Sequence, residues 1–425
     1  MQFFGFTISG LKKFSINTVW LFLEKVIRLS MGFLVGIWVA RYLGPEKFGV
    51  LNYGLAVMGL VMVFSNLGMD SIIVREIINQ PQTSSGILAS AWFMRIIGAL
   101  LIIVFEIILL LNSYTVENIV LIIVSLSIVV QSFAVVDLYF QSKVKNKYFA
   151  LANIFGISIT SLLRVYFIIS SGSLLNFAWL IPLESVIISL ILIISYYKQT
   201  SNLQWKINLT QMHMLIKKSW PLMLSFLFVS IYFKIDQVMI KYFLNSNHVG
   251  LYAAAIRISE IWYFIPVNIM ATLFPYIVSN RSSNNSLYIL RQKQLFRLMF
   301  WISFPIAVVI AIYSDSIMYF LYGNDYVGTS KVLTYHIWAT IFVFLGTAVN
   351  KILLAENLER HIMINSAIGA LLNILLNVYL IPRVGILGAA IATLVSYSAQ
   401  SFFLLLFWSK TRIIPVRICR SIIFQ

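Results

Sequence analysis

The sequence predicts an all-α, polytopic membrane protein, and two observations carry that prediction. The chain of 425 residues is 60% hydrophobic and only 11% charged, with a mean hydropathy of +0.91. A soluble domain is usually about half polar or charged, so a soluble fold could not bury this much apolar surface. In addition, apolar runs of about 20 residues, each long enough to cross ~30 Å of hydrocarbon as a helix, recur along the chain. Because these runs are continuously apolar rather than alternating, they indicate helices and not a membrane barrel.

Twelve such runs are separated by short polar or basic segments, none long enough to form an extramembrane catalytic domain. The longest connection, residues 198–218, carries four basic residues and no acid. It divides the chain into a six-helix lobe over residues 1–197 and a second over 219–409, followed by a basic cytoplasmic tail, 410–425. The expected helices cover residues 14–40, 48–69, 86–111, 117–139, 148–171, 174–197, 219–244, 249–279, 292–314, 331–355, 361–381 and 386–409.

The distribution of Lys and Arg predicts the orientation in the membrane. Of the 31 basic residues, twenty fall in loops on the side of the N-terminus, five on the opposite side and six within the spans. Cytoplasmic loops carry the excess of positive charge, so both termini are expected in the cytoplasm. The first helix is expected to act as an uncleaved signal anchor.

Several other functions are disfavoured by the composition. The net charge of +17 lies between apolar runs and not in a basic domain, so nucleic acid is not an expected partner. One cysteine and four scattered histidines predict no metal site and no cofactor. The stretch "GNDYVGTS", residues 323–330, has Thr329 where a phosphate-binding loop requires Lys. We therefore do not expect an enzyme.

The two halves of the sequence resemble each other. "GISITSLLRVYFIISSG" from Gly156 aligns with "GALLNILLNVYLIPRVG" from Gly369, and "RYLGPEKFGVLNYGLAV" parallels "KYFLNSNHVGLYAAAI" with one gap. Six spans separate the copies, so both begin on the same side of the membrane. A parallel repeat predicts two lobes related by a pseudo-two-fold axis along the membrane normal, as in alternating-access carriers with a substrate site between the lobes.

Charged residues within the spans are the candidate functional groups. Glu24 and Arg28 lie four residues apart in one span, and Arg257 and Glu260 three apart in another, so each pair can meet on one helix face. An unpaired charge at the bilayer centre costs ~2.5–3.5 kcal/mol, which favours either ion pairs that clamp helices or a polar cavity. Lys25 has no obvious local partner, which favours the polar cavity over an ion pair for this residue.

The stretch "FKIDQVMIKYF", residues 233–243, adds two more charges. Lys234 and Asp236 are two residues apart and face different directions, so Asp236 is expected to pair across helices, with Arg257. Arg and Lys bind phosphate well, Arg through its planar fork and Lys as a point charge. The sequence thus predicts a cationic cavity for an anionic ligand, lined by Lys25, Arg28, Lys234 and Arg257.

Several longer blocks resemble the polysaccharide transporter family of the multidrug/oligosaccharidyl-lipid/polysaccharide exporter superfamily. They are "VARYLGPEKFGVLNYGLAV", "LGMDSIIVREI", "IYFKIDQVMIKYFL", "VGLYAAAIRISEIWYFIP" and "IPRVGILGAAIATLVSY". The resemblance extends to about residue 409 and is strongest to Wzx-type O-antigen flippases. It implies a twelve-helix, two-lobed protein that moves undecaprenyl-pyrophosphate-linked O-antigen, or a related repeat unit, from the cytoplasmic to the periplasmic leaflet.

The resemblance also implies roles for particular residues. In the similar lipid II flippases, arginines of the first and eighth helices line a cationic cavity, and Lys25, Arg28 and Arg257 occupy comparable helices here. Lys234 stands where the family's "R-I-D-Q" block has Arg. Structural or coupling roles are left to Glu24, Asp236 and Glu260.

The same resemblance places the chain in lipopolysaccharide biosynthesis, where its partners would be an O-antigen polymerase and a chain-length regulator. The alternatives are a cation-coupled multidrug exporter of the same fold and a membrane-embedded polysaccharide polymerase.

Overall fold

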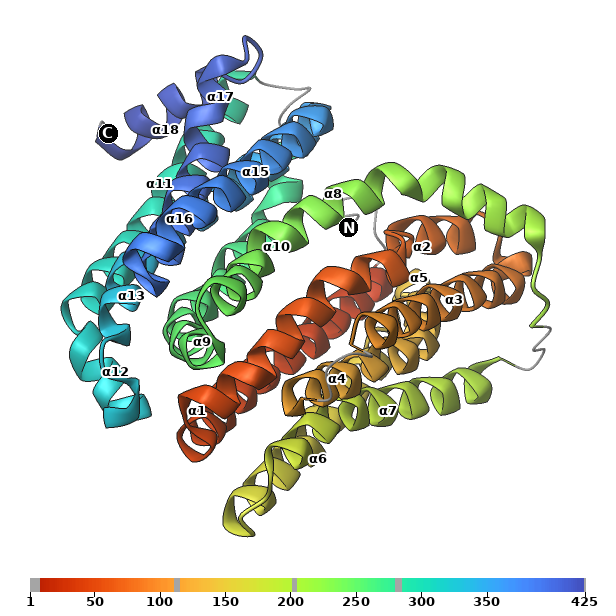
Figure 1. Ribbon diagram of the computed structural model, residues 1–425. Coiled ribbons are helices and arrows are strands. Elements are labelled where there is room, and N and C mark those ends of the chain that lie inside the picture. Colours follow the sequence, from red (N-terminus) through yellow and green to blue (C-terminus); the bar gives the residue numbers. More distant parts are fainter. Residues whose placement is uncertain (1–7, 111–114, 201–204, 280–284, 424–425) are drawn as a thin grey trace. The chain divides into compact units, whose positions relative to one another are not determined.

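The computed structural model describes residues 8–110, 115–200, 205–279 and 285–423, and throughout these ranges the chain forms helices and short connections without a strand (Figure 1). The all-α prediction is therefore confirmed. Arg281, which entered the count of basic loop residues, and residues 201–204 of the long polar connection lie outside the described ranges.

Ten helical segments are long and apolar enough to cross a membrane. This number is smaller than the twelve predicted spans because two of those spans are joined in one segment and another is divided into shorter helices. Helix α1 (Ile8–Asn66) comprises two predicted spans, which meet at a kink. At this kink Gly44 has a φ of 69°, and Pro45 follows it. The predicted eighth span is divided into α9 (Ser246–Glu260) and α10 (Phe264–Ser279) by a 3₁₀ turn, Ile261–Tyr263. Among the described residues, each of the twelve predicted spans is largely helical.

The first compact unit comprises residues 1–43 and 53–227. In it, α4 (Val116–Ser132) continues through a 3₁₀ turn, Phe133–Val136, into α5 (Asp137–Ser142), in which Asp137 is buried. Besides parts of α1 and α8 (Leu209–Phe243), its helices are α2 (Asp70–Asn79), α3 (Ser84–Leu110), α4 (Val116–Ser132), α5 (Asp137–Ser142), α6 (Lys147–Ile169) and α7 (Leu174–Gln199).

The second unit comprises residues 44–52 and 228–425. Helix α8 runs without interruption from one unit into the other, so this division falls after the predicted connection 198–218 and within a helix. Besides α9 and α10, its helices are α11 (Asn285–Ile312), α12 (Ser314–Tyr322), α13 (Thr329–His336), α14 (Ala339–Ala355), α15 (Glu359–Val384), α16 (Ile386–Ser398), α17 (Leu404–Phe407) and α18 (Ile413–Ile423).

The sequence repeat has a counterpart in the packing of each unit. Gly156 of α6 faces the next helix, and a Cβ there would lie 2.7 Å from Cγ1 of Ile188 on α7. Gly369, the matched residue on α15, also faces the following segment, at 3.3 Å from Cβ of Gln400. Each glycine therefore lets two consecutive helices approach closely in its own unit, as small residues do in membrane helix pairs.

Candidate functional site

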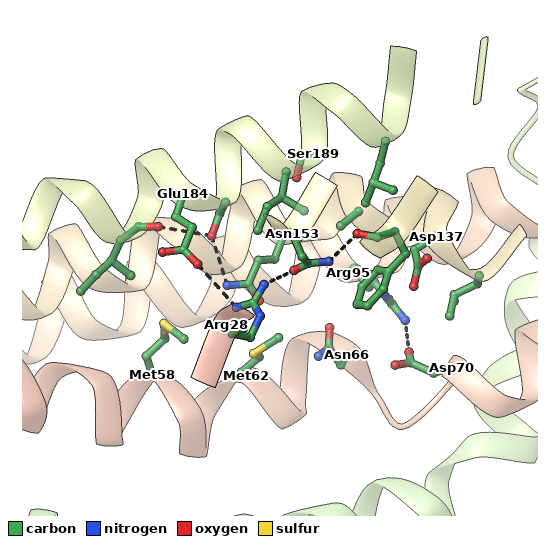
Figure 2. A pocket seen from close by; sticks show the side chains of 18 of the residues that line it. Arg28, Met58, Met62, Asn66, Asp70, Arg95, Asp137, Asn153, Glu184 and Ser189 are labelled. Atoms are coloured by element: carbon green, nitrogen blue, oxygen red, sulfur yellow. Dashed lines mark hydrogen bonds and ion pairs between the residues drawn. The ribbon is translucent and has the colours of Figure 1, made fainter. Parts of the chain in front are cut away.

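A cavity of about 570 Å³ lies within the first unit (Figure 2). Its apolar wall includes Met58, Met62, Leu138 and Ile188, from α1, α5 and α7. Its polar lining consists of Arg28, Asn66, Asp70, Arg95, Gln131, Asp137, Gln141, Asn153, Arg164, Glu184, Ser185 and Ser189.

Arg28 occupies one end of this cavity and is held by three oxygen-bearing side chains. Its Nε donates to Oε1 of Glu24 at 2.7 Å, so the predicted Glu24–Arg28 pair is present. Its other nitrogens approach Oε1 of Glu184 at 3.5 Å and donate to Oδ1 of Asn153. Glu184 is shared, because its Oε2 lies 3.2 Å from Nη2 of Arg164. One carboxylate of α7 thus joins α1 to α6 through two guanidinium groups.

Arg95 and Asp137 occupy the other end of the cavity (Figure 2). Arg95, on α3, donates through Nη2 to Asp70 at the start of α2. Asp137, at the start of α5, accepts a hydrogen bond at 2.7 Å from Nε2 of Gln141. Among the residues that line this cavity, two buried atoms have no hydrogen-bond partner in the described chain, Nε of Arg95 and Oδ1 of Asp137.

The lining of this cavity is balanced in charge. It contains three guanidinium groups and three carboxylates, those of Asp70, Asp137 and Glu184. Three of the six cations within the predicted spans are therefore compensated by acids. This arrangement is favourable because an unpaired charge at membrane depth is costly. The prediction of a cationic cavity does not describe this pocket. Sequence reasoning missed its acids, although each interrupts an otherwise apolar or small-residue stretch and is visible in the sequence for that reason.

The other three predicted cavity cations have no carboxylate within ion-pair distance among the described residues. Lys25 is exposed and Lys234 half-buried, and neither makes an ion pair or hydrogen bond within that part of the chain. The guanidinium of Arg257 lies 5.2 Å from the ring centre of Phe48.

The predicted Arg257–Glu260 pair is absent. Both residues lie on α9, which ends at Glu260, and the guanidinium of Arg257 lies over the Phe48 ring instead.

Asp236 is buried in the second unit, with 5% of its surface exposed, and it is surrounded by neutral donors. Tyr252 donates to its carboxylate at 2.8 Å and Asn377 at 2.6 Å, and Thr393 donates as well. The expected pairing with Arg257 is therefore wrong. Three donors from α9, α15 and α16 satisfy the carboxylate, while Arg257 lies on the Phe48 ring.

The described residues contain no group of three or more His, Cys, Asp or Glu side chains able to bind a metal ion. The side chains that donate to Asp236 are the hydroxyls of Tyr252 and Thr393 and the amide of Asn377.

Comparisons with known proteins extend these observations. The family model described as polysaccharide biosynthesis protein matches residues 15–281, and the MatE model matches residues 221–379. The "Probable low-salt glycan biosynthesis flippase Agl15" of Haloferax volcanii is 30% identical over 173 residues, covering 39% of this chain and 35% of the relative. The "Probable flippase AglR" of the same organism is 28% identical over 182 residues, covering 39% and 36%. The aligned part spans about a third of the length of these relatives.

Two solved structures have a similar fold. An inward-facing multidrug resistance MATE family transporter superposes with a TM-score of 0.72 at 15% identity, covering 93% of this chain and 95% of that one. The lipid II flippase MurJ, in an inward closed conformation, also superposes with a TM-score of 0.72, at 18% identity and with 96% and 91% coverage. These superpositions, over more than nine-tenths of each chain, confirm the predicted architecture of twelve helices in two lobes. The chain belongs to the polysaccharide biosynthesis protein family and has the fold of the multidrug/oligosaccharidyl-lipid/polysaccharide exporter superfamily.

Proposed function

We propose that this protein is a flippase for lipid-linked glycans. Its substrate is an undecaprenyl-pyrophosphate-linked repeat unit of O-antigen or a related surface glycan, moved by alternating access from the cytoplasmic to the periplasmic leaflet of a bacterial inner membrane. The observation that carries the proposal is a polar, charged cavity inside a helical unit of a polysaccharide biosynthesis family member. Such a cavity would shelter a head group that hydrocarbon excludes. The names of the two Haloferax volcanii relatives, each given as a "probable" flippase, support the same activity.

The pyrophosphate is bound in this proposal by cations that lack a carboxylate partner. Lys25, Lys234 and Arg257 have their positive charge available, and each would gain from an anion at membrane depth. Arg28 contacts the substrate from the cavity wall, with its charge offset by acids. The structural or coupling charges are Glu24, Asp236 and Glu260.

A second candidate is a cation-coupled multidrug exporter. One observation favours it, the presence of Asp70, Asp137 and Glu184 in the cavity lining, because carboxylates suit a cationic drug or a coupling ion. Against it, each of Arg28, Arg95 and Arg164 is bound to one or more acids, which reduces the negative charge available to a cation.

Deletion of the gene in its own host distinguishes the two candidate functions. For the flippase, we expect surface glycan to disappear and undecaprenyl-linked repeat units to accumulate in the cytoplasmic leaflet, with drug susceptibility unchanged. For the exporter, susceptibility to cationic drugs would rise while surface glycan stays normal. Expression of the chain from a plasmid should reverse whichever change appears. Association with an O-antigen polymerase and chain-length regulator would then be sought by crosslinking.

A further inference from the structure

Two buried polar atoms in the cavity of the first unit have no partner in the described chain. They are Nε of Arg95 and Oδ1 of Asp137, on residues that are 6% and 7% exposed. Both residues line the cavity, from α3 and α5. Buried polar groups in native proteins are almost always hydrogen-bonded, so an unpaired donor and an unpaired acceptor at one end of a cavity indicate a missing partner.

The remaining bonding capacity of the two residues restricts what that partner is. Nη2 of Arg95 is engaged by Asp70, and Oδ2 of Asp137 is engaged by Gln141. The Nε–H of Arg95 and Oδ1 of Asp137 are left as a buried donor and a buried acceptor. A hydroxyl group accepts from the first and donates to the second at the same time.

Charged ligands fit this end of the cavity less well than neutral ones. A phosphate oxygen accepts from Arg95 but cannot donate to Asp137, and it is repelled by the carboxylates of Asp137 and Asp70. A cationic group pairs with Asp137 but is repelled by Arg95. A neutral polyhydroxylated ligand meets neither repulsion.

The rest of the lining matches such a ligand. Amide and hydroxyl side chains of Asn66, Gln131 and Ser185 face the cavity, together with the apolar side chains of Met62 and Ile188. Sugars present hydroxyl edges to polar groups and C–H faces to apolar ones. The volume of about 570 Å³ lies within the range of ~300–1,000 Å³ typical of small-molecule sites.

We infer that the Arg95–Asp137 end of the cavity is a sugar-binding subsite, which receives hydroxyl groups of the glycan while the pyrophosphate is held elsewhere. The inference rests on the proposed flippase function and adds that the glycan and the pyrophosphate are bound by different groups of residues. Specificity for the glycan resides in the charge-balanced cavity of the first unit, and the anionic pyrophosphate depends on the cations without acid partners.

The test compares two lipids as probes, undecaprenyl pyrophosphate and the glycan-bearing undecaprenyl pyrophosphate extracted from the host lacking this gene. Binding of each to the full-length protein in nanodiscs is measured for the wild type, Asp137→Asn and Arg95→Lys. The second variant keeps the positive charge but removes the Nε–H group. Asp325→Asn, at an exposed acid of the second unit, is the matched control.

We expect both cavity variants to bind the glycan-bearing lipid about tenfold more weakly, the loss of one hydrogen bond to a charged group. Binding of the sugar-free lipid should stay within about twofold of the wild type, and Asp325→Asn should match the wild type for both probes. Thermal unfolding of each variant without lipid identifies any that fails to fold, and the conclusion then rests on the other.

Each of the other possible outcomes contradicts either the subsite inference or the proposed function. If the wild type binds both lipids equally well, the partner of Arg95 and Asp137 is water only, and the subsite inference is wrong. If the variants weaken both lipids alike, the cavity does not discriminate sugar from pyrophosphate, and the inference is again wrong while the flippase proposal stands. If the wild type binds neither lipid, the proposed function is wrong and the inference falls with it.

Discussion

Gly49 and Gly250 pack backbone against backbone where the segment 44–52 meets α9. A Cβ on Gly49 would lie 1.7 Å from the carbonyl oxygen of Ser246, and one on Gly250 would lie 1.9 Å from the carbonyl oxygen of Pro45. The two glycines stand in the stretches "RYLGPEKFGVLNYGLAV" and "KYFLNSNHVGLYAAAI", which the sequence repeat relates to each other. The repeat thus supplies one small residue from each half of the chain to the same close contact in the second unit.

This contact predicts that Gly250→Ala is destabilising. The added methyl group overlaps the backbone of Pro45, which cannot rotate away as a side chain would, and overpacking of this kind costs ~1–3 kcal/mol. Thermal unfolding of the purified protein should show a lowered Tm. Gly32→Ala is the matched control, because a Cβ there meets nothing within 4 Å. Equal Tm values for the two variants would contradict the close packing at Gly250.

Glu184 is predicted to be structurally important through its two guanidinium partners. Glu184→Gln removes a carboxylate that lies close to both Arg28 and Arg164, and should lower stability by ~1–3 kcal/mol. The measurement is thermal unfolding together with protein abundance in the membrane. Glu46→Gln, at an exposed glutamate, provides the control and should leave both unchanged. A Glu184→Gln protein as stable as the control would show that these ion pairs contribute little.

Arg257 is predicted to act on the substrate and not on folding. No carboxylate is paired with it in the described chain, so Arg257→Ala should abolish surface glycan at normal membrane abundance, and Arg257→Lys should retain part of the function. Arg412→Ala, at an exposed arginine, serves as the control. If Arg257→Ala disappears from the membrane, its contact with the Phe48 ring is structural and the substrate role is wrong.

Lys234 is predicted to require its positive charge. Lys234→Arg should support surface glycan, and Lys234→Glu should not, because a carboxylate would repel the pyrophosphate. Quantifying surface polysaccharide in a complemented deletion strain checks this expectation. Normal polysaccharide with Lys234→Glu would remove Lys234 from the substrate path.

Asp236→Asn is predicted to be severe. Tyr252, Asn377 and Thr393 all donate to the carboxylate, and an amide NH₂ in its place would face a donor and leave it unsatisfied, at a cost of ~1–3 kcal/mol. Membrane abundance and Tm should both fall, whereas Asp315→Asn at an exposed position should change neither. Exchanging Asp236 and Arg257 should not restore folding, since the two are not paired. Rescue by that exchange would show that they do pair in the working protein.

Much of the fold is predictable because hydropathy and helical spacing are properties of the local sequence. The twelve apolar runs, the internal repeat and the Glu24–Arg28 pair, four residues apart on one helix, required no knowledge of how helices pack. The kink at Gly44 and the 3₁₀ turn at Ile261–Tyr263 were not foreseen, because a hydropathy profile is insensitive to backbone geometry within an apolar run.

Tertiary structure alone decided the partners of the charges. Glu184 reaches Arg28 from a helix far along the chain, and Asp236 is satisfied from α15 and α16 instead of by Arg257. Such pairings depend on the rotation and depth of each helix relative to its neighbours, and an apolar span of given composition is compatible with many rotations. The sequence by itself therefore determined that charges lie within the membrane-spanning helices, and the packing of those helices determined which charges are compensated and which remain available.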